Sequence, residues 1–210
     1  MAALLVALNR LEPTTVCVVG QVLQPGESVI AFASWTNTWF PFNSDRPQLI
    51  EDVMAGNLCV HRRSAIAVGG FDENFKGAAL YFESEFAIRI RASGGAIAFE
   101  PAVGIRHLRA ASGGTRTKGT QFTTWRPHHS VGKYYIAFLK GPARALRALL
   151  IEPVRAIRTR HHLAAPWWIP ATLCAEVLGM GWAFLLMTRG RRLIDTTDAS
   201  PVTKRGYADA

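Results

Sequence analysis

The sequence predicts an α/β domain followed by a helical, membrane-associated extension. Over the first half of the 210 residues, short β-branched runs and helical patterns follow one another between turn signals. Most of the excess of 24 Lys and Arg over 15 Asp and Glu lies beyond residue 105, around the most apolar segment. This distribution favours a membrane surface over nucleic acid as the phosphate-rich partner, because no zinc-finger, helix-turn-helix or RNA-binding signature is present.

The first segment, MAALLVALNRLEP, predicts an amphipathic helix with Leu4, Leu5 and Leu8 on one face and Pro13 at its end. A signal peptide is not expected, because no basic region precedes the apolar run and no small-residue cleavage site follows it. The next run, TTVCVVGQVL (residues 14–23), predicts a buried strand that ends near Pro25-Gly26.

Residues 31–50 are aromatic and turn-rich and predict a long ordered loop, which either lines a pocket or is held to the core by its aromatic side chains. Residues 57–63 (NLCVHRR) predict another strand, followed by a short helix. A second helix is expected from Tyr81 to Ser93, where Glu85 and Arg89 can pair at i, i+4.

The stretch GAIAFEPAVGIRHL predicts a strand, a break at Pro101 and a second short strand reaching His107. Residues 109–133, rich in Gly, Thr, Arg, Lys and His, predict a mobile polar loop.

The segment from residue 134 to 162 predicts a basic amphipathic helix with a possible kink at Pro153. Such a helix lies either along an anionic membrane surface or packed on the domain as an ordinary surface helix. Its apolar face carries Leu146, Leu149, Leu150, Val154 and Ile157, and the other face carries mainly Arg144, Arg147, Arg155 and Arg158.

Residues 163–188 are long and apolar enough to cross a bilayer. Two alternatives remain open, a transmembrane or re-entrant segment and a buried helix of a soluble fold. Glu176 in the middle and Pro170 near the start count against a simple span, whereas Trp167 and Trp168 suit a membrane interface.

Several polar residues between positions 56 and 107 could carry chemistry. Glu83, near the start of a helix, could take a proton from a sugar hydroxyl as a general base. Asp72, just after a Gly pair, could hydrogen-bond an acceptor, and His107 could bind a divalent cation that neutralises a leaving diphosphate. The alternative is a solvated glutamate and a structural histidine.

The order of these motifs is more specific. GNLCVHRRSAIAVGGFDENF, then ESEFAIRIRASGG, then FEPAVGIRH resembles the acceptor half of family 2 glycosyltransferases. The resemblance covers residues 1–107 and implies a GT-A fold, a nucleotide-diphospho-sugar donor and Mg²⁺ or Mn²⁺. It also implies that the donor-binding half, with its DxD motif, is lacking, so that a partner chain could supply it.

The resemblance implies a role for seven residues. Glu83 corresponds to the family's Asp base, while Phe82 replaces the Glu that precedes this base in the family. His107 corresponds to the cation-linked histidine. The substrate-binding positions implied by the motifs are Asn57, Gly70, Asp72, Glu85 and Arg89.

The expected organisation has four parts: a partial GT-A domain (1–108), the polar loop (109–133), a membrane-associated helical segment (134–192) and a disordered tail (193–210). The expected function is sugar transfer to a lipid or polysaccharide acceptor, with Glu83 as base. The alternatives are a catalytically inactive, membrane-bound remnant that binds a glycan or a partner glycosyltransferase, and a basic membrane-surface protein that matches by chance. Three widely spaced cysteines predict reduced thiols, and the expected location is the cytoplasmic face of the cell membrane.

Overall fold

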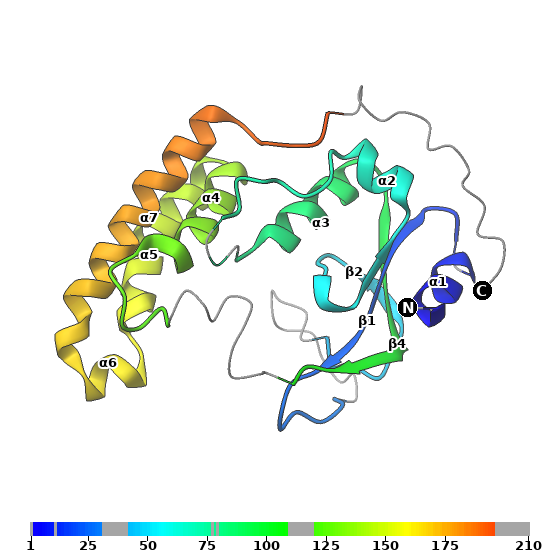
Figure 1. The fold of residues 1–210 in the computed structure, drawn as a ribbon, viewed down its shortest axis with the longest axis horizontal. Coiled ribbons are helices and arrows are strands. Elements are labelled where there is room, and N and C mark those ends of the chain that lie inside the picture. Colours follow the sequence, from blue (N-terminus) through cyan, green and yellow to red (C-terminus); the bar gives the residue numbers. More distant parts are fainter. Residues whose placement is uncertain are drawn as a thin grey trace, which may run out of the picture.

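The computed structural model describes residues 2–10, 12–30, 42–76, 78, 80–108 and 120–195. These residues form a mixed sheet covered by helices and, beside it, a group of helices built from the last third of the chain (Figure 1). The α/β class predicted from the sequence is therefore confirmed. Residues 31–41, 109–119 and 196–210 lie outside the described part, so the predictions for the aromatic loop, the polar loop and the tail are tested only at their edges.

The sheet has four strands in the order β2-β4-β1-β3. The central pair, β1 (Thr15–Leu23) and β4 (Ala96–Arg106), is parallel, and the edge strands β2 (Gln48–Ile50) and β3 (Leu58–Val60) run antiparallel to their neighbours. β1 is buried over nearly its whole length, as expected for a strand with neighbours on both sides and helices on both faces.

Helix α1 (Ala2–Arg10) covers one face of the sheet. Leu4 and Leu8 pack against Val18 of β1 in a small buried cluster. The predicted apolar face is thus confirmed for two of its three members, but Leu5 is 52% exposed, so its assignment to the buried face was wrong. Residues at i and i+4 lie on the same side of a helix, whereas i and i+1 are about 100° apart.

Helix α3 (Phe82–Ala92) packs on the opposite face. Its Phe86 and Ile90 are fully buried against the side chains of β1 and β4 that point away from α1. The prediction of a helix from Tyr81 to Ser93 is confirmed to within one residue at each end. The predicted strand at 57–63 is shorter than expected, because η1 (Ala55–Asn57) precedes β3 and α2 (Arg62–Ala67) follows it.

Pro101 does not end the strand in which it lies. β4 continues to Arg106, although its pairing with β1 is irregular between the pairs Gly20↔Glu100 and Val22↔Ile105. Pro101 falls within this irregular stretch and beyond the end of β2, so its missing N–H interrupts no ladder. The expected break is therefore a bulge within one strand, not a division into two.

The C-terminal helices pack around α4, whose Tyr134 and Tyr135 are buried against Ala183 and Leu186 of α7. The prediction of a single helix over 134–162 was wrong. A turn at Gly141 (φ 101°) separates α4 from α5. Helix α5 then continues through Pro153. η3 and the start of α4 fall within the segment predicted as a loop. The bounds are η3 Pro127–His129, α4 Val131–Leu139, α5 Pro142–Ile157, α6 Arg160–Ala164, η4 Pro166–Trp168 and α7 Ile169–Arg189.

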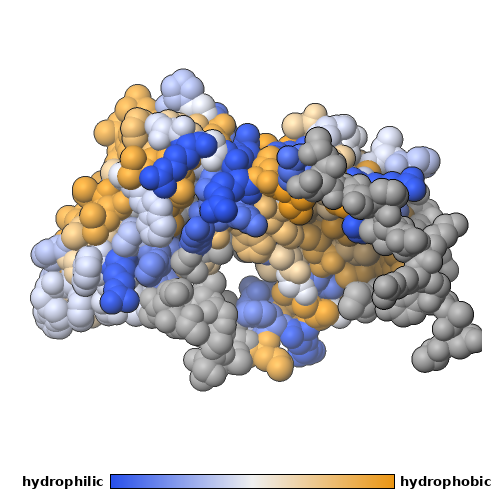
Figure 2. Space-filling view, turned by 45° about the horizontal axis from the view of Figure 1, so that its top comes forward, coloured by the Kyte–Doolittle hydropathy of each residue, from blue (hydrophilic) through white to orange (hydrophobic). Residues whose placement is uncertain are grey.

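Helix α5 turns its small residues toward the protein and its large apolar residues outward. Ala148 packs on the α4–α7 cluster, whereas Leu146, Leu150 and Val154, spaced four apart, are all more than half exposed. The arginines of α5 lie on an adjoining exposed face. In Figure 2, hydrophobic and hydrophilic side chains gather in adjacent areas on the helical part of the molecule.

Helix α7 is also exposed on one side. It belongs to the only stretch within the described ranges, Pro166–Arg189, that is long and apolar enough to cross a membrane, by length and composition alone. Val177, Phe184 and Leu185 are more than half exposed, whereas Glu176 is buried. The Glu176 carboxylate accepts a hydrogen bond from the Tyr134 hydroxyl (2.5 Å) and pairs with Lys133 (2.7 Å), so its charge is compensated inside the helical group.

Candidate functional site

The loop with the sequence GGFDE is covered by the chain itself. After α7, residues 190–194, here called the strap, run back across α3 to this loop (Figure 1). The Glu73 N–H donates to the Arg192 carbonyl (3.0 Å), and the Ile194 N–H donates to the Gly69 carbonyl (2.9 Å). The strap therefore joins the helical group to the loop between α2 and α3 by backbone hydrogen bonds.

The two glycines of the loop are needed by the strap. Gly69 and Gly70 have φ values of 81° and 68°, which L side chains rarely adopt. A Cβ at Gly69 would lie 2.7 Å from the Cβ of Leu193, and one at Gly70 would lie 2.7 Å from the Cδ1 of Ile194. The Gly-Gly pair thus provides both the turn and the space for the strap.

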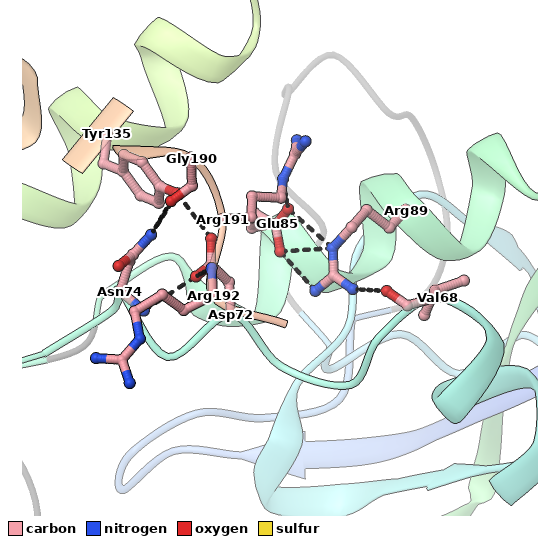
Figure 3. Close-up of polar contacts among 9 residues, drawn as sticks. All are labelled: Val68, Asp72, Asn74, Glu85, Arg89, Tyr135, Gly190, Arg191 and Arg192. Carbon is pink, nitrogen blue, oxygen red and sulfur yellow. Dashed lines mark hydrogen bonds and ion pairs between the residues drawn. The ribbon is translucent and has the colours of Figure 1, made fainter. Parts of the chain in front are cut away.

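Asp72, predicted to bind substrate, holds the strap in place (Figure 3). Its Oδ1 accepts from the backbone N–H groups of Asn74 and Arg192, both at 3.0 Å, and its Oδ2 accepts from the Tyr135 hydroxyl at 2.8 Å. The Asn74 amide donates in turn to Tyr135 Oη (3.0 Å) and to the Gly190 carbonyl (2.8 Å). Burial, together with the hydrogen bond to Asp72, raises the pKa of Tyr135, so its hydroxyl remains a donor.

Glu85 and Arg89 form the predicted i, i+4 pair, with the guanidinium Nη2 2.7 Å from Oε2. Arg191 of the strap adds a second cation, its Nε lying 2.7 Å from Glu85 Oε1. Arg89 also donates to the Val68 carbonyl. Because Glu85 is 1% exposed and both its oxygens are engaged, its carboxylate completes the attachment of the strap and does not face a pocket.

Glu83 lies in a different environment. It lines a pocket of about 520 Å³ between the start of α3, the chain before η1 and the end of α4. Its Oε1 accepts a hydrogen bond from the Ala55 N–H at 2.5 Å. Burial raises the pKa of the Glu83 carboxyl, the nearby Asp52 charge adds to the rise, and the Ala55 hydrogen bond partly offsets it. The other lining residues are Phe42, Asp52, Val53, Met54, Leu80, Tyr81, Ser84, Ile136 and Lys140.

The entrance to α3 is strained. Tyr81, the N-cap residue, has φ 72°, an uncommon left-handed conformation for a side chain of this size. This conformation places Tyr81 and Leu80 in the wall of the pocket and starts the helix so that Glu83 falls in its first turn, where the helix dipole favours a carboxylate. Phe82, at the position of the family's Glu, packs edge-to-face against Phe71 with 5.2 Å between ring centroids.

Asn57 is a structural cross-link between the two central strands. Its Nδ2 donates to the Gln21 carbonyl of β1 (3.0 Å) and to the Val103 carbonyl of β4 (2.8 Å), at the irregular pairing around Pro101. The side chain is buried, and its amide protons are both engaged. It thus compensates for the strand pairing lost at the bulge.

His107 lies beyond the ends of β1 and β4, where its Nδ1 is 3.0 Å from Gln24 Oε1 and its N–H donates to the Leu23 carbonyl. The Glu83 carboxylate accepts its hydrogen bond from the Ala55 N–H, and no hydrogen bond joins it to His107 in the described part of the chain. Within the described ranges, no group of three or more His, Cys, Asp or Glu side chains is arranged to hold a metal ion. The expected Mg²⁺ or Mn²⁺ site therefore stays a prediction, with His107 as its one candidate ligand in this chain.

The structure brings together residues that the sequence did not connect. Asp52, Tyr81 and Lys140 share the pocket of Glu83, and the Ser84 hydroxyl donates to Asp52 at 2.9 Å. Asp52 follows an acidic neighbour in a turn-rich stretch, and nothing local in the sequence distinguishes it. Lys140 lies at the C-cap of α4, where the helix dipole favours a cation. This position is the one local signal in the sequence that could have indicated Lys140.

Comparisons with protein-family models, with curated proteins and with solved structures give no significant match for this chain. Function is therefore inferred from the chemistry of the pocket and of the surfaces around it.

Proposed function

We propose that the chain is the acceptor-side portion of a membrane-associated glycosyltransferase, in which Glu83 is the general base. The observation that carries the proposal is the Glu83 carboxylate, with its raised pKa, in the wall of a 520 Å³ pocket. A carboxylate whose pKa is shifted toward neutrality is a better proton acceptor at physiological pH than an ordinary glutamate. The pocket also carries Lys140 and hydroxyl groups that can orient a polar acceptor.

In the proposed reaction, Glu83 accepts the proton of an acceptor hydroxyl whose oxygen attacks the anomeric carbon of the donor sugar. The new bond is the glycosidic C–O bond, and the bond that breaks joins the anomeric carbon to the diphosphate oxygen, which leaves with its electron pair. Lys140 supplies a positive charge beside the pocket. In the family that the sequence resembles, a nucleotide-binding half holds the donor, and the proposed reaction needs such a half beside this pocket.

The test is transfer of a labelled sugar from UDP-, GDP- or dTDP-sugars by the full chain, together with membranes of its source that contain any partner and acceptor. Glu83→Gln is expected to reduce transfer by about 10²–10⁴-fold, the usual contribution of a general base. Glu51→Gln is the matched control, since Glu51 pairs with Arg91 at the surface and does not line this pocket. Equal activity of the chain and its Glu83→Gln variant, both folded, would overturn the role of Glu83.

The strap favours a second function, a non-catalytic subunit. Gly70, Asp72 and Glu85, which the resemblance assigns to the acceptor, are engaged by residues 190–194. In this alternative the chain binds a partner glycosyltransferase or a glycan at the membrane and does not transfer sugar. Copurification of a transferase whose activity needs the chain, but does not change with Glu83→Gln, would favour this function over the first.

A further inference from the structure

A second cavity, of about 210 Å³, lies inside the helical group. It is smaller than a typical drug-sized pocket and suits a single polar group. Its walls come from α4, α5 and α7 and from the chain that leads into η3, so it lies on the other side of Leu80 and Tyr81 from the pocket of Glu83. The side chains that matter below are Tyr81, Arg126, Lys133, Glu152, Arg155 and Glu176.

The charges of this cavity do not balance. Both carboxylates are already paired: Glu176 with Lys133 (2.7 Å) and Glu152 with Arg155 (3.0 Å). Three cations thus face two carboxylates. The guanidinium of Arg126 makes no hydrogen bond or ion pair with any residue in the described part of the chain, and only its backbone N–H is engaged, by Thr124 Oγ1 (3.1 Å).

Neutral donors complete the lining. The pKa of Tyr81 is raised, mainly by burial and then by the nearby Glu152 charge, so its phenol keeps its proton and can donate. Gln121 and Thr124 line the same wall. An acceptor-only anion with several oxygens can use a guanidinium and such donors together, and a phosphate group has this chemistry.

The position of the cavity indicates where such a phosphate comes from. Arg155 lines the cavity, yet its side chain is 62% exposed on the outer surface of α5. The exposed leucines of α5 lie on the adjoining face of this helix. Beyond its end, Leu163 and Trp167 are strongly exposed as well, and tryptophan is favoured at a membrane interface. A head group in the cavity would therefore leave its alkyl chains beside apolar side chains.

We propose that this cavity binds the phosphate head group of a membrane amphiphile, with Arg126 as its principal ligand. The proposal goes beyond glycosyl transfer and holds whether or not Glu83 is a base. It differs from general attraction to an anionic surface because it depends on Arg126, an exposed residue that lines this cavity, and not on the sum of all exposed charges.

The experiment measures binding of the full chain to phosphatidylcholine vesicles that contain phosphatidic acid or phosphatidylglycerol, with mole fractions adjusted to equal surface charge. The wild-type chain is expected to prefer phosphatidic acid, whose phosphomonoester has more oxygens free to enter the cavity. Arg126→Gln should reduce affinity for phosphatidic acid by about tenfold, as for loss of one charged hydrogen bond, and abolish the preference.

Arg147→Gln is the matched control, because Arg147 is exposed on the same helical group but does not line the cavity. It should weaken binding to both lipids by the same factor and leave the preference intact. An equal loss of preference in both variants, or no preference in the wild type, would overturn the proposal. Inorganic phosphate provides a further arm: if it binds as tightly as the lipid does, the cavity is a site for free phosphate and the membrane source is wrong.

Discussion

At the scale of single residues, Glu83 differs from an ordinary surface glutamate because it is partly buried and lines a pocket. It lies near Asp52, and within the described ranges the Ala55 N–H is the one group that hydrogen-bonds to its carboxylate. Its raised pKa therefore represents a cost to folding that a catalytic role would explain. The contrast is Glu85, two residues further on, whose full burial is balanced by two arginines.

This difference predicts how stability depends on pH. Because the pKa of Glu83 is higher in the folded than in the unfolded chain, the folded state loses stability as pH rises from the ordinary value of 4.5 through the raised pKa. Glu83→Gln removes the ionisation and keeps an oxygen for the Ala55 N–H. Denaturant unfolding should therefore show the variant gaining stability relative to wild type between pH 4 and pH 7. A constant difference across this range would contradict the prediction.

Gly70 and Gly26 allow a matched comparison of what one added Cβ atom does to stability. Gly70→Ala and Gly26→Ala both place a side chain at positive φ (68° and 80°), which costs about 1–2 kcal/mol. Only Gly70→Ala also meets the strap, since nothing lies within 4 Å of a Cβ at Gly26. Thermal or denaturant unfolding should show Gly70→Ala to be less stable by a further ~1–3 kcal/mol. Equal losses would show that the strap yields freely at Ile194.

At the scale of elements, the strap is attached to α3 by an ion pair between Arg191, which is 36% exposed, and the buried Glu85 carboxylate. Arg191→Gln should cost about 2 kcal/mol in the free energy of unfolding, because it removes one of the two cations from a buried carboxylate. Arg192→Gln is the control at the next position: its pair with Glu73 (3.3 Å) is exposed and should contribute about 0.5 kcal/mol. Similar losses in the two variants would indicate that Arg191 does not pair with the buried Glu85 in solution.

The elements also show what could be predicted from the sequence. α3 was located to within a residue because its signals are local: an acidic first turn, apolar residues at i and i+4, and a Gly-Gly stop. β1 was found for the same reason, since its β-branched run is short and bounded by turn residues. The sequence does not predict the break at Gly141, because the apolar pattern continues on both sides of it. Pro153 is the stronger helix-breaking signal in this segment, yet α5 continues through it.

The strap could not be predicted, because its partners are far apart in the chain. Asp72 and Arg192 are 120 positions apart, and Glu85 and Arg191 are 106 apart. A pattern read in windows of a few residues contains no information about such pairs. The candidate site could be predicted only in part. A motif indicates Glu83, but its pocket neighbours Asp52 and Lys140 come from distant segments that no local pattern connects to it.

At the scale of the whole molecule, the exposed apolar faces of α5 and α7 support the proposed membrane association, and they fit a position on the membrane surface better than a span. Glu176 is tied to Lys133 and Tyr134, so the inner side of α7 is held by polar contacts to α4. α4 leads directly into α5 with its exposed arginines. A span by α7 would place this attached polar structure in hydrocarbon.

Flotation with anionic vesicles tests this surface. Combined Leu146→Ser and Leu150→Ser changes should weaken binding by about tenfold or more, because each removes apolar area that would enter the interface. Leu49→Ser is the control: Leu49 is 70% exposed on β2, far from the helical surface in the fold. Unchanged flotation of the double variant, with wild-type thermal stability, would show that α5 does not contact the bilayer.

The strap also has a consequence for biosynthesis. A ribosome adds about 5–20 residues per second, so Asp72 waits on the order of ten seconds for Arg192 to be synthesised. During this interval the Glu85 and Asp72 carboxylates lack the partners that residues 191 and 192 provide. The contacts between the GGFDE loop and the strap can therefore form only after α7 has been synthesised. If the proposed membrane association holds, the exposed apolar faces of α5 and α7 are complete before these contacts form.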